Sequence, residues 1–145
     1  VVDLPSARAQ RVPEEVDNVP EKVKPRLVMV ADDEPHIRAV VAMKLRAAGF
    51  EVQEAGDGQE ALALCRETPP DLVITDLQMP YMSGLELCVA LKSEAGTRTT
   101  PALLLTARGF LVSDEQIAGT NIRGVRSKPF SVRDVLSDAE RLLAA

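Results

Sequence analysis

The chain has 145 residues and a formal net charge of -5, from 17 basic and 22 acidic side chains. This length suits one ordinary domain with a sizeable core and excludes a two-domain enzyme. The acidic balance argues against direct nucleic-acid binding, because that function needs cations to meet the phosphates. Since only 3% of the residues are aromatic, we expect a core of Val, Leu, Ile and Ala.

Residues 1–25 differ in composition from the rest of the chain. They contain four of the ten prolines among charged residues, without sustained periodicity. We interpret this segment as a disordered or extended leader or linker, because it offers few apolar groups to bury. Residues 26–145 then form the folded domain. Because no run of about 18 apolar residues and no signal-peptide pattern is present, we expect a cytoplasmic protein that does not bind membranes.

Short apolar runs alternate with amphipathic stretches from Arg26 onward. In chain order, the sequence predicts strands at residues 27–31, 50–54, 71–76, 102–105 and 123–127, and helices at about residues 35–48, 59–67, 84–93, 113–119 and 131–144. Such alternation favours an α/β fold: one parallel five-stranded sheet, doubly wound as a (βα)5 three-layer sandwich. Cys65 and Cys88 lie in predicted helices without a CxxC motif or a nearby His, so we expect both to be small buried hydrophobes.

Polar residues follow four of the five predicted strands. Asp32 and Asp33 come after the first strand, and Asp76 ends the third. Thr106 follows the fourth strand and Lys128 the fifth. Because ligands of doubly wound sheets bind beyond the carboxyl ends of the strands, we expect these side chains to converge on one rim.

The residue types on this rim favour phosphoryl chemistry. Three neighbouring carboxylates repel one another unless protons or a cation neutralise them. Oxygen ligands select a hard cation, and Mg2+ suits a site that binds through carboxylates and phosphate oxygens. Thr106 and Lys128 supply donors for the remaining phosphoryl oxygens. Asp76 is the candidate nucleophile, since a carboxylate can form an acyl phosphate.

Four motifs carry a resemblance to a known family. They are Asp32-Asp33, the D-x-x-M-P-x-x-x-G pattern from Asp76 to Gly84, Thr106-Ala107 and Lys128-Pro129-Phe130. With these motifs, residues 26–145 resemble the receiver domain of two-component response regulators, a CheY-like family. The resemblance implies a flavodoxin-like fold and a role in signal transduction.

The resemblance also implies roles for the rim residues. Asp76 would accept a phosphoryl group from a histidine of a sensor histidine kinase or a His phosphotransfer protein. Asp33 would bind Mg2+ directly and Asp32 through a water molecule, while Asp76 and the backbone carbonyl of Gln78 would complete the protein ligands. Thr106 and Lys128 would contact the phosphoryl group. A cis peptide bond is expected between Lys128 and Pro129.

One family feature is missing. Receivers carry an aromatic switch residue three positions before the conserved Lys, and this chain has Val125 there. Since Val has few χ1 states, we expect the signal to emerge through the loop after Thr106 and the weak helix that follows it. Around this edge, we expect Arg108, Arg123 and Arg126 to be exposed.

Three functions are weighed against one another. The first is a phosphorylation-dependent switch acting on a downstream protein that the sequence does not identify. The second is a receiver-like interaction module that works without phosphorylation. The third is a Mg2+-dependent phosphohydrolase, which is disfavoured because Gln78 stands where a second catalytic carboxylate is needed. Any catalysis would then be confined to the chain's own aspartyl phosphorylation and dephosphorylation. Since the last predicted helix uses the chain to its end, we expect no output domain in this chain, which is either a stand-alone regulator or a receiver cut from a larger protein such as a hybrid kinase.

Overall fold

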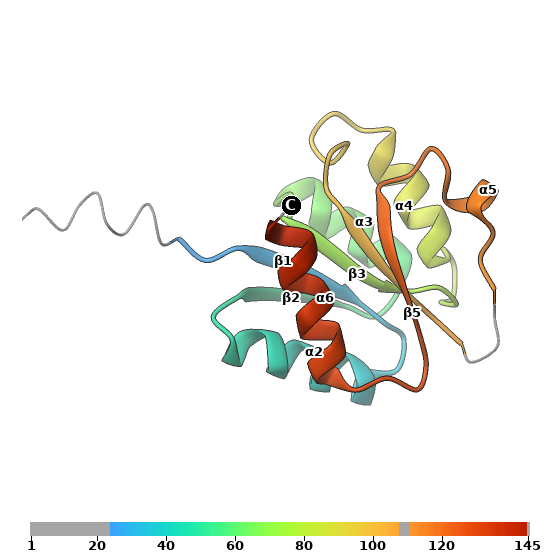
Figure 1. The fold of residues 1–145 in the computed structure, drawn as a ribbon. Helices are drawn as coiled ribbons and strands as arrows, with labels where there is room; N and C mark the ends of the chain where they lie inside the picture. Colours follow the sequence, from blue (N-terminus) through green and yellow to red (C-terminus); the bar gives the residue numbers. More distant parts are fainter. Residues whose placement is uncertain (1–23, 108–110, 145) are drawn as a thin grey trace, which may run out of the picture.

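A computed structural model describes residues 24–107 and 111–144 (Figure 1). Nearly all of the predicted leader, residues 1–25, lies outside this part of the chain. The described residues contain five strands: β1 (Leu27–Ala31), β2 (Glu51–Ala55), β3 (Leu72–Asp76), β4 (Ala102–Thr106) and β5 (Ile122–Ser127). The strands pair in parallel in the order β2-β1-β3-β4-β5, which confirms the predicted doubly wound sheet.

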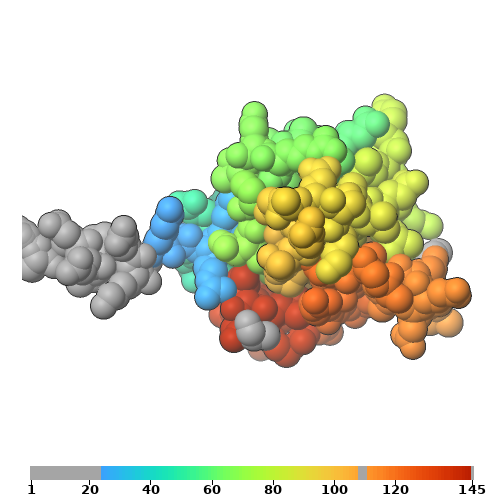
Figure 2. Space-filling view, turned by 90° about the horizontal axis from the view of Figure 1, so that it is seen from above, coloured from blue at the N-terminus to red at the C-terminus, as the bar shows by residue number. Residues whose placement is uncertain are grey.

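Helices cover both faces of the sheet (Figure 1). They are α2 (Pro35–Ala47), α3 (Gly58–Glu67), α4 (Gly84–Lys92), α5 (Asp114–Ile117) and α6 (Val132–Ala144). α2 and α6 lie on one face, and α3 and α4 on the other. α5 is shorter than the predicted helix at residues 113–119, because Ala118 leaves the helical region at φ -60° and ψ 136°. In Figure 2 the orange segment that contains α5 stands out at one edge of the molecule.

Alternate residues of the strands point to opposite faces of the sheet and pack into two separate hydrophobic cores. Val28, Ile74 and Leu103 pack toward α2 and α6. Val73 and Leu104 pack toward α3 and α4. The second core also takes both thiols, which are buried as predicted: Cys65 and Cys88. Burial raises the pKa of each thiol to about 12, so both are inert hydrophobes at neutral pH.

The β5 edge differs from the sequence prediction at one residue. Arg123 is exposed as predicted, and Arg108 lies outside the described residues. Arg126 was predicted to be exposed, and this was wrong: its guanidinium is half-buried because it pairs with Asp138 of α6. Val125 has 44% of its surface exposed.

The amino edge of the sheet brings the two described ends of the chain together. Arg26 donates a hydrogen bond of 2.7 Å from Nη1 to the carbonyl of Leu143 at the end of α6. Next to it, the backbone N–H of Leu27 donates to Asp71 Oδ2 over 2.8 Å. No helix in the described residues is long and apolar enough to cross a membrane.

Candidate functional site

The opposite, carboxyl edge of the sheet gathers the predicted polar residues. Asp32 follows β1, Asp76 ends β3, and Lys128 follows β5. Carboxylate oxygens of Asp32, Asp33 and Asp76 lie within 4.8 Å of one another. Lys128 Nζ is 3.2 Å from Asp76 Oδ1 and 3.7 Å from Asp32 Oδ2. The parallel register therefore brings four side chains from three strand ends into one cluster.

Two further predicted site residues have different surroundings. Thr106 ends β4 with its hydroxyl buried and without a hydrogen-bond partner among the described residues. Gln78 is exposed in the loop after β3. The peptide bond between Lys128 and Pro129 is cis, as predicted.

Glu34 also belongs to the cluster, and sequence reasoning missed it. Its carboxylate accepts a hydrogen bond of 3.1 Å from Lys128 Nζ. Its backbone N–H donates to Asp32 Oδ1 over 2.9 Å, which fixes the orientation of that carboxylate. The available signal was a third acidic residue directly after Asp32-Asp33.

Burial and mutual repulsion perturb the carboxyl groups. Burial, followed by the charge of Asp32, raises the pKa of Asp76 to about 6, although Lys128 acts in the opposite direction. Burial likewise raises the pKa of Asp32. Burial works to lower the pKa of the Lys128 ammonium, but the hydrogen bond to Glu34 and the charges of Asp32 and Asp76 together raise it. The cluster thus carries more negative charge than one ammonium offsets.

The residues present fit a magnesium ion. All candidate ligand atoms are oxygens, which a hard cation requires. Asp32 Oδ2 is buried and accepts no hydrogen bond in the described residues, so it has a free position for a cation or a water on one. An ion would also relieve the repulsion that raises the pKa of Asp76.

A tight loop after β3 packs against the backbone of Asp76. The N–H of Gly84 donates to the carbonyl of Leu77 over 2.8 Å. A Cβ at Gly84 would overlap the backbone oxygen of Asp76, so only glycine fits there. Ser83 caps α4 in a capping box with Glu86, which fixes where the helix begins.

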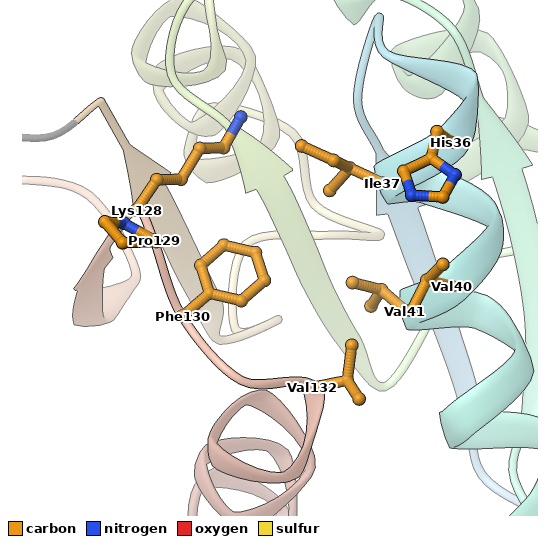
Figure 3. A pocket seen from close by; sticks show the side chains of 8 residues that line it. All are labelled: His36, Ile37, Val40, Val41, Lys128, Pro129, Phe130 and Val132. Atoms are coloured by element: carbon orange, nitrogen blue, oxygen red, sulfur yellow. The ribbon is translucent and has the colours of Figure 1, made fainter.

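An apolar cavity of about 400 Å3 lies beside Lys128, between α2 and the connection from β5 to α6. Figure 3 shows the Phe130 ring pointing toward α2, while the amine of Lys128 points away from that ring. The lining residues are His36, Ile37, Val40, Val41, Lys128, Pro129, Phe130 and Val132. The cluster and this cavity share Lys128, so they adjoin one another.

Comparison with known proteins identifies the family. The family model for the response regulator receiver domain matches residues 28–140. The chain therefore belongs to the response regulator receiver family of two-component signalling, which confirms the resemblance seen in its sequence motifs.

Individual relatives agree with this assignment. The transcriptional regulatory protein PdtaR of Mycobacterium tuberculosis is 39% identical over 117 residues, which are 80% of this chain and 56% of PdtaR. The chemotaxis response regulator CheY4 of Vibrio cholerae is 32% identical with a TM-score of 0.76, over 82% of this chain and 99% of CheY4. The response regulator TrrA of Thermotoga maritima, solved in complex with Mg2+ and BeF, is 30% identical with a TM-score of 0.72, over 81% of this chain and 98% of TrrA. The chain spans about half the length of the curated relatives it matches.

Proposed function

We propose that residues 26–145 form a signalling switch in which Asp76 accepts a phosphoryl group in a Mg2+-dependent reaction. The carrying observation is the position of Asp76, whose carboxylate lies 3.2 Å from Lys128 Nζ and within 4.8 Å of two further carboxylates. A nucleophile between a cation site and an ammonium is the arrangement that phosphoryl transfer needs. Residues 1–25 serve as a leader or linker.

In the proposed reaction, a carboxylate oxygen of Asp76 forms a bond to the phosphorus of a phosphohistidine. The P–N bond of the donor breaks, and its electron pair stays on the imidazole nitrogen. Lys128 pairs with one oxygen of the transferred group, and the buried hydroxyl of Thr106 donates to another. A bound Mg2+ would offset the charge of the phosphoryl oxygens. Asp33, Asp76 and the backbone carbonyl of Gln78 would hold the ion, and Asp32 would contribute through a water molecule.

The proposed donor is a sensor histidine kinase or a His phosphotransfer protein, which places the reaction in the cytoplasm where ATP is available. The apolar cavity beside Lys128 provides a docking surface for this partner, because it adjoins the cluster that contains Asp76. Exposed apolar surface next to a reactive group favours a protein partner. Phosphorylation then changes the affinity for a downstream protein by shifting a two-state equilibrium.

Intact-mass spectrometry after incubation with acetyl phosphate tests the proposal. We expect the mass of one phosphoryl group to be gained with Mg2+ present, and the gain to be lost with chelator or in Asp76→Asn. Asp114→Asn, which changes an exposed carboxylate of α5, is the matched control and should label normally. A gain that survives Asp76→Asn or ignores chelator contradicts the assignment. Absence of labelling in the unmodified chain favours an interaction module that works without phosphorylation.

A further inference from the structure

We propose that Glu34 is a positioning residue that holds the Lys128 ammonium in the unphosphorylated protein and competes for it with the phosphoryl group. This inference rests on the proposed function. It adds to that function a determinant of phosphorylation rate and of donor preference.

Glu34 occupies a backbone position for which its side chain is poorly suited. It is the N-cap residue of α2, where Ser, Thr, Asp and Asn are preferred, and its side chain makes no capping hydrogen bond. The carboxylate instead reaches Lys128, which is 94 residues further along the chain, at an Oε1–Nζ distance of 3.1 Å. The side chain is therefore committed to the cluster rather than to its own helix.

Three carboxylates surround the Lys128 ammonium. It has three N–H donors, and its nearest acceptors belong to Glu34 at 3.1 Å, Asp76 at 3.2 Å and Asp32 at 3.7 Å. A phosphoryl oxygen that binds Lys128 must compete with these carboxylates for the ammonium. The side chain of Glu34 is 57% exposed, whereas those of Asp76 and Asp32 are 8% and 1% exposed. Because water takes over the hydrogen bonds of an exposed carboxylate most easily, Glu34 is the partner that leaves.

The charge of Glu34 gives a second consequence. It is an additional carboxylate at the mouth of a cluster that already contains three. Its repulsion acts more strongly on a doubly charged donor such as acetyl phosphate than on phosphoramidate, which carries less negative charge. Neutralising Glu34 should raise the rate constant for phosphorylation by acetyl phosphate about threefold at low salt. The rate constant for phosphorylation by phosphoramidate should rise by less.

The rate measurement uses the full chain with Mg2+ and both donors, followed by intact mass. Glu34→Gln should show the unequal increase, and the difference between donors should shrink in high salt. Glu51→Gln, which removes an exposed charge at the first residue of β2, is the matched control and should leave both rates unchanged. Equal changes with both donors in Glu34→Gln overturn the inference.

A second measurement reads the contact itself. The Lys128 ammonium protons, detected by NMR in metal-free protein, should exchange with water faster in Glu34→Gln than in the unmodified chain. Glu34→Asp keeps the charge but is too short for the contact, so it should also give fast exchange. Beryllofluoride with Mg2+ should restore slow exchange in all variants, because it takes the place of Glu34. Unaltered exchange in both Glu34 variants overturns the inference, whereas failure of the unmodified chain to become phosphorylated overturns the proposed function.

Discussion

Arg126 of β5 donates two hydrogen bonds to the carboxylate of Asp138 on α6, from Nε and Nη2, each 2.8 Å long. Asp138 is buried and also accepts a hydrogen bond of 3.2 Å from Arg141. The two-pronged geometry fixes the last helix against the edge strand. Arg126 directly follows Val125 in β5, and Val125 stands at the position where related receivers carry their aromatic switch residue.

Replacement of Asp138 by Asn should lower the free energy of unfolding by about 1.5–3 kcal/mol at pH 7, because a charge-assisted pair is lost. The hydrogen bonds from Arg126 lower the pKa of Asp138 in the folded protein. Its stabilising effect is therefore present above the unfolded pKa and disappears as pH falls through the folded pKa. Urea melts of the unmodified chain and of Asp138→Asn at pH 7 and pH 3 measure this difference in the free energy of unfolding. Asp134→Asn, 3.9 Å from Arg126 and exposed, is the control and should have little effect.

Asp76→Asn should stabilise the metal-free protein at pH 7, by about 1–3 kcal/mol. The pKa of Asp76 is raised to about 6 by burial, so its ionisation in the fold opposes folding. This free-energy penalty is absent below the unfolded pKa and grows as pH rises toward the folded pKa. The gain in melting temperature should shrink at pH 4. Added Mg2+ should stabilise the unmodified chain more than the variant, and the opposite order would contradict our account of the cluster.

Gly84→Ala should destabilise the domain by about 1–3 kcal/mol, the usual effect of overpacking. The added methyl group would overlap the backbone oxygen of Asp76, which cannot move without shifting the end of β3. Gly96→Ala is the control, because its Cβ would meet only Pro69 Cγ at 3.9 Å. Denaturant melts of both variants give the comparison. Equal stability of the two would show that the loop relaxes without strain.

Val40→Glu should slow phosphotransfer from a phosphorylated His phosphotransfer protein more than tenfold, since it places a charge in the apolar cavity. Labelling by acetyl phosphate should be little altered, because a small donor does not need the docking surface. Met43→Glu adds the same charge to the exposed face of α2 and serves as the control. Loss of both reactions in Val40→Glu would indicate a folding defect rather than loss of docking.

Amide hydrogen exchange should locate the signal between Ala107 and Asn121 when beryllofluoride and Mg2+ are added. α5 is four residues long and buries none of them, so we expect this helix to lie at the low-stability end of the described domain. Val125 cannot bury or expose as much area as an aromatic ring. A change confined to α4, or one that appears only in Val125→Tyr, would contradict this route.

Much of the architecture follows from the sequence because strand ends are marked by abrupt changes. The apolar run before Asp32 and the one before Asp76 each end in a carboxylate, and parallel pairing then places both at one edge. Burial of Cys65 and Cys88 also followed from simple pattern. These features depend on local composition and on a topology with few alternatives.

The sequence did not predict which side chains pair with one another when they come from distant parts of the chain. The contact between Glu34 and Lys128 joins residues 94 positions apart, and no periodicity reports it. Arg126 was expected to be exposed as one of three arginines at a basic edge. It is half-buried between exposed neighbours in β5, because Asp138 lies within reach on α6. Such pairs depend on how one element lies over another, which only the three-dimensional arrangement fixes.

The hydrogen bond from Arg26 to the carbonyl of Leu143 places the start of β1 beside the end of α6, at the pole away from Asp76. A short peptide between these ends would permit circular permutation, with new termini opened in an exposed loop such as the one around Gly96. A surface anchor or a fluorophore placed near Arg26 would likewise leave the carboxyl edge open to a phosphodonor. The contact of Arg26 thus marks the amino edge of the sheet as the part of the domain that can be tethered, whereas the carboxyl edge must remain accessible.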